Sequence, residues 1–308
     1  MDVSVVIPVY NEAQNIILLY DRLQRVLALL PHSYEIIFIN DGSRDQSEQL
    51  LDQLYHQDPE HVRIVHFNGN FGQHMAIMAG FEQSIGQTVI TLDADLQNPP
   101  EEIPALLEEM AKGHDIVEGV RQGRQDNAFR RYASRINNWI RAKTTGIRLQ
   151  DQGSMLRAYD RRVVDLMLMS KEQSTFIPAL AYSYASSPGF VAVKHAQRHS
   201  GYSKYSLARL LRLHFDLMAG FSSAPLQWVT FTGMSVSILS FLFFIYMVIR
   251  RLVIGPEADG LFTLFAIQFL LLGLLLFSVG IVGEYVGRIY LEVRKRPRFV
   301  IKKVLSKR

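Results

Sequence analysis

Two aspartates separated by one residue, Asp93 and Asp95, are the side chains of this sequence best suited to chemistry. They follow the apolar run 88–92, whose β-branched residues are typical of a buried strand, and Pro99 and Pro100 then prevent regular backbone hydrogen bonding. Carboxylate oxygens are the preferred ligands of Mg²⁺ and Mn²⁺, which share their other positions with substrate phosphates. The pattern predicts a nucleotide diphosphate held through a metal. A solvated turn, where aspartate is also common, is the alternative interpretation.

The surrounding elements are those that would bring such residues together. Short apolar runs predict strands at 3–9, 35–39, 62–67, 88–92 and 115–120, and helical spacing predicts helices at 16–30, 43–55 and 72–84. This alternation predicts an α/β fold with a parallel, Rossmann-like sheet covered on both faces. Polar residues follow the other strands as well, namely Asn11, Glu12, Asp41, Asn68 and Asn70. Because the carboxyl ends of parallel strands share one edge, we expect these residues to converge on one crevice.

The second half of the sequence has a different character. No charged residue occurs at 217–249 or at 260–283, and each gap exceeds the roughly 20 residues that cross a bilayer. We therefore expect transmembrane helices at 226–249 and 261–283, after an amphipathic helix whose leucines alternate with Arg209 and Arg212. A core helix is an equally good interpretation of that amphipathic pattern. The expected domains are a cytoplasmic catalytic domain at 1–205, an interfacial helix at 206–225, two membrane helices at 226–286 and a basic cytoplasmic tail at 287–308.

Charge and cysteine content limit the partners and the compartment. The net charge is only +4, but basic residues crowd the end of the chain, directly after the second apolar segment. That position favours anionic lipid over nucleic acid as the partner of the tail. There is no cysteine, which excludes disulfides and thiolate chemistry, and no secretion signal is visible at the start. We expect the front of the chain in the cytoplasm.

Three segments carry a family resemblance: VVIPVYNE at 5–12, INDGS at 39–43 and DADLQ at 93–97. They resemble the inverting glycosyltransferases of family 2, which have the GT-A fold. Further segments, at 70–74, 96–104, 121–126, 155–159 and 174–178, together with the two apolar segments, resemble the polyprenyl-phosphate glycosyltransferases within that family. The similarity covers nearly the whole chain.

The resemblance implies a metal-dependent transferase that moves a sugar from a UDP-sugar to undecaprenyl phosphate at the cytoplasmic face of the bacterial inner membrane. It is strongest to members that transfer 4-deoxy-4-formamido-L-arabinose in lipid A modification. Transfer of glucose or mannose is the first alternative, and a membrane-tethered nucleotide-sugar-binding protein without catalysis is the second. A homo-oligomer, a tetramer by resemblance, is also implied.

The same resemblance assigns roles to individual residues. Asp95 and Gln97 would hold Mg²⁺ or Mn²⁺, and catalysis would involve Asp93, Asp95 and Asp151. The expected nucleotide-sugar pocket comprises Pro8, Tyr10, Asn11, Glu12, Asp41, Asp93, Ala94, Asp95, Arg198 and Lys204. Glu12 and Asp41 could instead be acids that stabilise helix N-termini, and Asp151 could belong to an ordinary turn.

The lipid phosphate needs cationic partners, and arginine binds phosphate through paired donors. The expected acceptor-phosphate residues are Arg121, Arg124, Arg131 and Ser134. A solvated basic face is the alternative for this run. His74 and His199 are each isolated from other metal ligands in sequence, so we expect them to be hydrogen-bonding residues.

Overall fold

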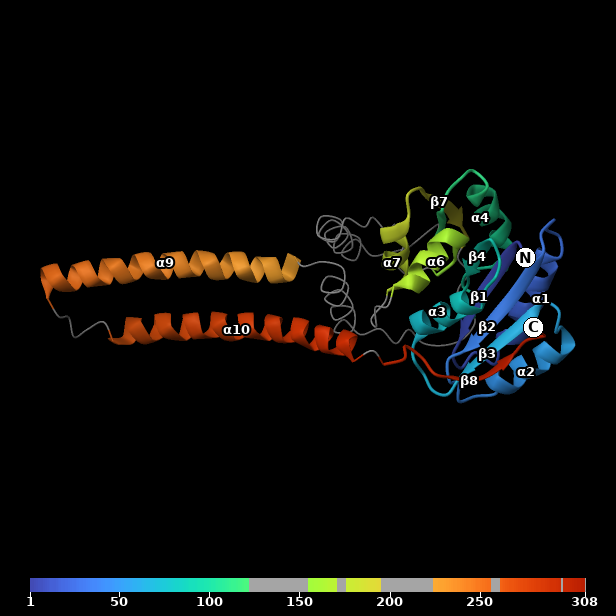
Figure 1. Cartoon of the computed structure of the whole chain (residues 1–308), viewed down its shortest axis with the longest axis horizontal. Helices are drawn as coiled ribbons and strands as arrows, with labels where there is room; N and C mark the ends of the chain where they lie inside the picture. The colour runs from blue at the N-terminus through green and yellow to red at the C-terminus, as the bar shows by residue number, and fades with distance from the viewer. Residues whose placement is uncertain (122–154, 171–175, 195–223, 256–260, 295, 308) are drawn as a thin grey trace. The chain divides into compact units, whose positions relative to one another are not determined.

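The structure is a computed structural model that describes residues 1–121, 155–170, 176–194, 224–255, 261–294 and 296–307 (Figure 1). The chain divides into two compact units. The first comprises Met1–Tyr205 together with Arg296–Arg308, and the second comprises Ser206–Lys295.

An eight-stranded sheet forms the centre of the first unit, in the order β7-β5-β6-β4-β1-β2-β3-β8. The strands are β1 Val3–Val9, β2 Tyr34–Asn40, β3 Val62–Phe67, β4 Thr88–Thr91, β5 Ile116–Arg121, β6 Arg157–Asp160, β7 Pro188–Val193 and β8 Ile301–Leu305. β1 pairs in parallel with β2 and β4, β2 with β3, and β5 with β7. β6 runs antiparallel to β4 and β5, and β8 runs antiparallel to β3.

The α/β prediction is confirmed, but the expectation of a wholly parallel sheet is wrong. The short strand β6 lies between β4 and β5, and β8 occupies an edge, so the sheet is mixed. Since β6 is antiparallel to both of its neighbours, β4 and β5 run in the same direction. The carboxyl ends of β1, β2, β3, β4 and β5 therefore still meet at one edge of the sheet.

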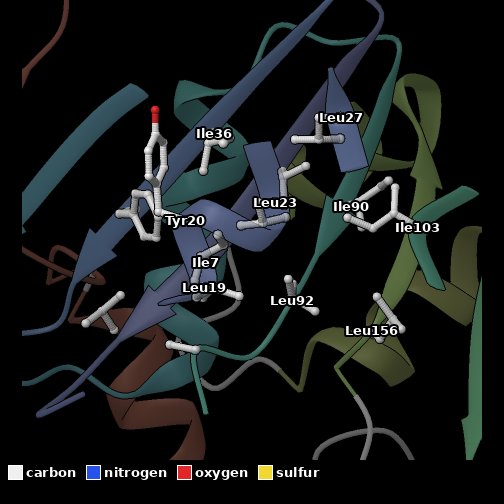
Figure 2. Close-up of a cluster of buried hydrophobic side chains, with 14 of the residues drawn as sticks. Ile7, Leu19, Tyr20, Leu23, Leu27, Ile36, Ile90, Leu92, Ile103 and Leu156 are labelled. Atoms are coloured by element: carbon white, nitrogen blue, oxygen red, sulfur yellow. The ribbon is translucent and has the colours of Figure 1, made fainter. Parts of the chain in front are cut away.

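Helices cover both faces of this sheet. On one face, α1 (Ile16–Leu27), α2 (Ser47–Gln57) and α4 (Ile103–Met110) share a single buried apolar cluster with the strands. Figure 2 shows Leu19 and Leu23 of α1 in this cluster with Ile7 and Ile36, and Ile103 lies in it beside Ile90. Burial of a side chain of this kind contributes about 1.5–3 kcal/mol, which is why the apolar stripe of α1 fixes its orientation.

The opposite face carries α3 (Gln73–Gln83), α6 (Arg161–Met169) and α7 (Ile177–Tyr184), with α6 and α7 in contact with α3. α3 packs very closely on β1: a Cβ atom on Gly80 would lie 2.1 Å from a methyl carbon of Val6. A glycine is therefore needed at this contact. The position of α3 matters because its first residue lies at the carboxyl edge of the sheet. The short 3-10 helix η1 (Pro100–Glu102) leads into α4.

The end of the chain is part of the sheet, which differs from the expected basic tail. β8 pairs with β3, with Lys303 opposite His66. Its lysines form ion pairs with acids of the α2 region: Lys302 with Glu48 at 2.8 Å and Lys303 with Asp52 at 3.0 Å. Lys307 pairs with Glu60. The cations of this part of 287–308 thus have protein partners, and its contact with lipid stays a prediction.

The second unit contains two long helices, α9 (Ala224–Ile254, 31 residues) and α10 (Leu261–Val293, 33 residues). Both predicted apolar segments are helical where described, and both helices are longer than predicted. Across the part of the chain that the structure describes, no helix is long and apolar enough to cross a membrane. The expected interfacial helix at 206–225 lies almost entirely outside the described residues.

Candidate active site

The turns that follow β1 and β2 are joined by hydrogen bonds. The backbone N–H of Asn11 donates to Oγ of Ser43 (3.0 Å), and the backbone N–H of Arg44 donates to Oδ1 of Asn11 (2.8 Å). Asn11 has φ of +56°, a left-handed conformation that asparagine adopts more readily than most residues. Two residues further, the backbone N–H of Ala13 donates to Oδ2 of Asp45 (3.1 Å). The two turns therefore form one structure.

The other residues predicted for the nucleotide pocket near β1 also lie at the carboxyl end of this strand. Tyr10 is 43% exposed, and Pro8 is the partly buried residue near the end of an otherwise buried strand. Glu12 accepts a hydrogen bond from Nδ2 of Asn15 (2.6 Å), and its backbone N–H donates to Oγ of Ser47 (3.1 Å). Pro8, Tyr10, Asn11 and Glu12 are thus together at the carboxyl end of β1. Their contact with a nucleotide stays a prediction.

Asp41 joins this pair of turns to the loop after β3. Oδ1 accepts from the backbone N–H of Phe71 (2.6 Å), and Oδ2 accepts from Gly72 N–H (2.9 Å) and from Nδ2 of Asn70 (3.0 Å). Asp41 is only 3% exposed. Burial raises its pKa, although the two backbone donors act in the opposite direction. Both oxygens already have loop partners, so the observed role of Asp41 is to hold this loop.

The loop held by Asp41 leads directly to Asp93. Gly72, at φ of +94°, precedes Gln73, the first residue of α3. The side chain of Gln73 donates from Nε2 to Oδ1 of Asp93 (2.6 Å), and Nδ2 of Asn98 approaches Oδ2 (3.3 Å). A continuous series of contacts thus runs from Asn11 through Asp41 to Asp93. The predicted convergence of the strand ends is observed in the described residues.

The carboxylate of Asp93 is buried and lies within the electrostatic influence of Asp95. Burial, and then the negative charge of Asp95, raise the pKa of Asp93 to about 7. The backbone N–H of Gln97 donates to Oδ1 of Asp95 (3.1 Å). Leu96, the residue between Asp95 and Gln97, is 1% exposed. Its φ is +61°, which is uncommon for a residue with a bulky side chain. Such strain costs about 1–3 kcal/mol and is often found at functional sites.

The donor set here fits a hard divalent cation. It consists of carboxylates and an amide oxygen, and a cation would relieve the repulsion from Asp95 that adds to the effect of burial on the pKa of Asp93. No group of three or more His, Cys, Asp or Glu side chains that could hold a metal occurs among the residues described. Proteins bind Mg²⁺ through one or two carboxylates together with substrate phosphates. Asp95 and Gln97 remain the predicted ligands.

The predicted acceptor residues are only partly described. Arg121 ends β5, so it lies at the same edge of the sheet as the other strand ends. The remaining predicted residues, Arg124, Arg131, Ser134, Asp151, Arg198 and Lys204, lie outside the described residues. His199 does as well. Their assigned roles stay predictions.

Two supporting features were missed from the sequence. Gln73 and Asn98 both contact Asp93, and only their position beside the strand ends could have indicated them. Beneath the site, Arg157 on β6 and Glu118 on β5 form a fully buried ion pair at 2.6 Å, and the Tyr182 hydroxyl donates to Glu118 (2.9 Å). Glu118, a charged residue inside the apolar strand β5, could have indicated a buried ion pair. Its partner Arg157 is 39 residues away in the sequence, so the pair itself could not be predicted.

His74 is one of the two histidines expected to be hydrogen-bonding residues. Its Nδ1 is buried and has no hydrogen-bond partner within the described part of the chain, although a hydrogen-bonding role was expected. The ring instead makes an edge contact with Phe176, at 5.0 Å between ring centroids. Burial, with a contribution from the positive charge of Arg157, lowers the pKa of His74 to about 4. His74 is therefore neutral at neutral pH, and its expected hydrogen-bonding role stays a prediction for the other ring nitrogen.

Comparison with known proteins gives the following similarities. Residues 4–167 match the family described as Glycosyl transferase family 2. The chain is 49% identical over 305 residues to an undecaprenyl-phosphate 4-deoxy-4-formamido-L-arabinose transferase of Pseudomonas fluorescens, covering 98% of this chain and 89% of that protein. It is 46% identical over 306 residues to the protein of the same name from Yersinia pestis, covering 99% and 94%.

Solved structures are similar at much lower identity. S. aureus TarS 1-349 in complex with UDP-GlcNAc is 16% identical with a TM-score of 0.48, covering 71% of this chain and 66% of that chain. Glucosyl-3-phosphoglycerate synthase from Mycobacterium tuberculosis, in complex with Mn²⁺, UDP and phosphoglyceric acid, is 18% identical with a TM-score of 0.48, covering 71% and 76%.

Proposed function

The chain belongs to Glycosyl transferase family 2, and we propose that it transfers the sugar of a UDP-sugar to undecaprenyl phosphate. Its α/β fold with a mixed sheet agrees with the GT-A class expected of this family. The names of its relatives support 4-deoxy-4-formamido-L-arabinose as the sugar, since identity of 46–49% extends over nearly the whole chain. The product would serve lipid A modification.

The observation that carries this proposal is the series of contacts along the carboxyl edge of the sheet. Asn11, Asp41 and Asp93 come from the ends of three strands, and hydrogen bonds connect their loops. Ligands of open α/β sheets bind at this edge. A nucleotide contacting the turns after β1 and β2 would extend its diphosphate toward Asp93 and Asp95.

The reaction is a substitution at the anomeric carbon. An oxygen of the lipid phosphate attacks that carbon, the bond from the carbon to the diphosphate oxygen breaks, and UDP leaves with the bonding electrons. Because the acceptor is already an anion at neutral pH, a strong general base is less necessary than for a sugar hydroxyl. The configuration at the anomeric carbon inverts.

The protein must therefore position two anionic groups close together. When bound, Mg²⁺ or Mn²⁺ would stabilise the charge of the leaving diphosphate as a Lewis acid, with Asp95 and Gln97 as its protein ligands. Gln73 and Asn98 hold the Asp93 carboxylate in place. Arg121 would bind the acceptor phosphate, together with Arg124, Arg131 and Ser134, and Asp151 would orient that phosphate or act as base.

The second unit would hold the enzyme at the lipid. Large apolar side chains are exposed along both of its helices, among them Phe231, Leu242, Leu275 and Phe277 at 57–66%. Exposed apolar surface of this extent needs cover, and the charge-free segments 217–249 and 260–283 support the hydrocarbon of a bilayer as that cover. We place the catalytic unit at the cytoplasmic face of the inner membrane. Assembly into a homotetramer is part of the same proposal.

The test is a transfer assay with purified full-length protein in detergent. Undecaprenyl phosphate is incubated with Mn²⁺ or Mg²⁺ and a panel of radiolabelled UDP-sugars, and labelled lipid is measured. We expect label from UDP-4-deoxy-4-formamido-L-arabinose only. Label from UDP-glucose, or from a mannose nucleotide added to the panel, would reassign the donor. Nucleotide-sugar binding without labelled lipid from any donor would overturn the proposal in favour of a non-catalytic binding protein.

A further inference from the structure

Three adjacent strands carry a row of polar residues that leads from the C-terminal strand toward the site. In the register of the sheet, Lys303 of β8 lies opposite His66 of β3, and His66 lies opposite Asn40 of β2. His66 and Asn40 are 0% and 1% exposed. Buried polar side chains in a sheet interior are costly unless they are hydrogen-bonded, so their partners indicate why they are there.

Each neighbour in this row is hydrogen-bonded to the next. Nζ of Lys303 donates to Oδ2 of Asp52 (3.0 Å), whose Oδ1 is 2.8 Å from Nε2 of His66. Nδ1 of His66 is 3.0 Å from Nδ2 of Asn40. Oδ1 of Asn40 in turn accepts the backbone N–H of Ser43 (3.0 Å). Ser43 is the residue whose hydroxyl accepts the backbone N–H of Asn11.

The donors and acceptors of this row are consistent along its whole length. Because Ser43 N–H donates to Asn40 Oδ1, the amide of Asn40 is oriented with Nδ2 toward His66. Nδ1 of His66 is then the acceptor, and Nε2 carries the hydrogen that is donated to Asp52. Asp52 fits this role: burial raises its pKa, but hydrogen bonds from Lys303 and His66 outweigh burial and leave it lowered.

A second contact connects the same C-terminal segment to the loop after β3. Phe299 stacks on Phe67 with ring centroids 5.0 Å apart, and Phe67 makes an edge contact with Phe71 at 5.6 Å. Phe71 is the residue whose backbone N–H is bound by Asp41. The backbone N–H of Asn68 also donates to the carbonyl of Val300 (3.0 Å). The C-terminal segment thus contacts the loop after β3 and, through the row from Lys303 to Asn40, the turn after β2.

From these contacts we propose that β8 positions the nucleotide-binding turns, and that Lys303, acting through Asp52, His66 and Asn40, is a positioning residue for the nucleotide. This inference rests on the proposed function, because it assumes that the turns after β1 and β2 bind the donor. Lys303 does not touch the nucleotide. Its ion pair fixes Asp52, which keeps His66 and Asn40 in the orientation that the turn at 43–44 requires.

The chain contains a matched control for Lys303. Lys302 also lies on β8 and also pairs with an acid of α2, Glu48, at 2.8 Å. The side chains of the two pairs are similarly exposed, at 53% and 38% for Lys302 and Glu48 and at 45% and 29% for Lys303 and Asp52. Only Asp52 contacts His66 among these acids, so only Lys303 is connected to the turn.

The experiment measures UDP binding to the full-length protein in detergent by titration calorimetry, in the presence of Mn²⁺. We expect Lys303→Met to weaken UDP binding about fivefold, which corresponds to the loss of one hydrogen bond of the row. Lys302→Met should bind UDP like the wild type. Thermal unfolding should be affected to a similar, small extent by both substitutions, because each removes one exposed ion pair.

A double mutant tests the route of the effect. His66→Phe removes the donor and the acceptor of the row, and His66→Gln retains one of each. We expect weaker UDP binding for His66→Phe, partial recovery for His66→Gln, and no further loss when Lys303→Met is added to His66→Phe. Lys303→Met alone decides the question if His66→Phe does not fold.

The outcomes separate this inference from the function on which it rests. If the wild type binds UDP and Lys303→Met binds it as well as Lys302→Met does, β8 is only a structural edge strand and the inference is overturned. Additive losses for Lys303→Met and His66→Phe would also overturn it, because the two residues would then act independently. If the wild type itself binds no UDP, the proposed function fails and this inference with it.

Discussion

At the scale of single residues, three aspartates at one edge of the sheet have different environments. Asp41 uses both oxygens to hold a loop. Asp93 is fixed by Gln73 and Asn98 and has a raised pKa. Asp95, which contributes to that shift, is the predicted metal ligand together with Gln97. Sequence position alone does not distinguish these roles, because all three residues follow strands.

Asp95→Asn removes one charge from the predicted metal site. We expect transfer to fall by at least about 100-fold, as is typical when a group that stabilises the charge of the leaving group is lost. The unfolding midpoint should stay near that of the wild type, since Asn can still accept the backbone N–H of Gln97. Labelled lipid and thermal unfolding are the measurements, and chelation of divalent cations is the control. Full turnover after chelation would contradict a metal-dependent mechanism.

His74 makes stability depend on pH in a defined direction. Its pKa is about 4 in the folded protein, because of burial and the nearby Arg157, and about 6.5 when unfolded. Between these values the unfolded chain binds the proton and the folded chain does not. The contribution of His74 is therefore fully present above pH 6.5 and is lost as the pH falls toward 4.

His74→Phe keeps the contact with Phe176 and removes this titration. Relative to the variant, the wild type should lose on the order of 2 kcal/mol between pH 6.5 and pH 4. The comparison uses denaturant unfolding of both proteins across the pH range, because other acids titrate equally in each. Parallel curves for the two proteins would show that His74 is protonated as easily in the folded state as in the unfolded one.

At the scale of elements, the strands that could be predicted are those with continuous apolar runs. The predictions for β1 and β3 match their observed bounds, because both strands are buried and rich in Val and Ile. β6 has only four residues with a charge at each end, and β8 contains two lysines, so neither has the pattern of a buried strand. The two lysines of β8 pair with acids on α2, which lie about 250 residues earlier in the chain.

The residues of the candidate site could be predicted only where they directly follow a long strand. Residues directly after the long strands, such as Asn11 and Asp93, were identified because strand ends share an edge. Gln73 and Asn98 were not, because their contacts depend on how α3 and the segment after Asp95 fold back. The buried pair of Arg157 and Glu118 depends on β6 lying between two other strands, which no local pattern indicates.

The packing of two loops against each other gives a test at this scale. Gly42 has φ of +65°, and an added Cβ would lie 2.4 Å from the carbonyl carbon of Gly69. Gly113 also has positive φ, at +94°, but a Cβ there would meet no atom within 4 Å. We expect Gly113→Ala to cost about 1–2 kcal/mol from backbone strain alone. Gly42→Ala should cost about 3–4 kcal/mol, because overpacking is added to strain.

Denaturant unfolding gives both values, and UDP binding provides the functional readout. Only Gly42→Ala should weaken binding, since Gly42 lies between Asp41 and Ser43 in the site. If both variants are destabilised equally, the turn after β2 does not contact the loop at 69–70 as closely as the structure indicates. A loss of stability at Gly42 that left UDP binding unchanged would show instead that the turn after β2 does not shape the UDP site.

At the scale of the whole molecule, the first unit is built from two separate parts of the chain. Residues 1–205 supply seven of the eight strands, and the last strand comes from the segment after α10. A truncation that removes the two long helices therefore also removes β8. The edge of β3 would then be unpaired, and an exposed strand edge promotes aggregation. The helices and the catalytic sheet are separable only if β8 is retained.

The last prediction compares two fragments that lack the long helices. One ends at Ala219, and the other joins Ala219 through a flexible glycine–serine linker to residues 296–308. The first should unfold at a lower temperature and bind UDP weakly, because its β3 edge and the row from Lys303 to Asn40 are incomplete. The second should recover both properties. Transfer to a short-chain, water-dispersed acceptor should be measurable only with the second fragment. Equal stability and UDP binding in the two fragments would show that the sheet is complete without β8. Weak binding by both, with normal folding, would show that the segment between residues 219 and 296 shapes the site directly.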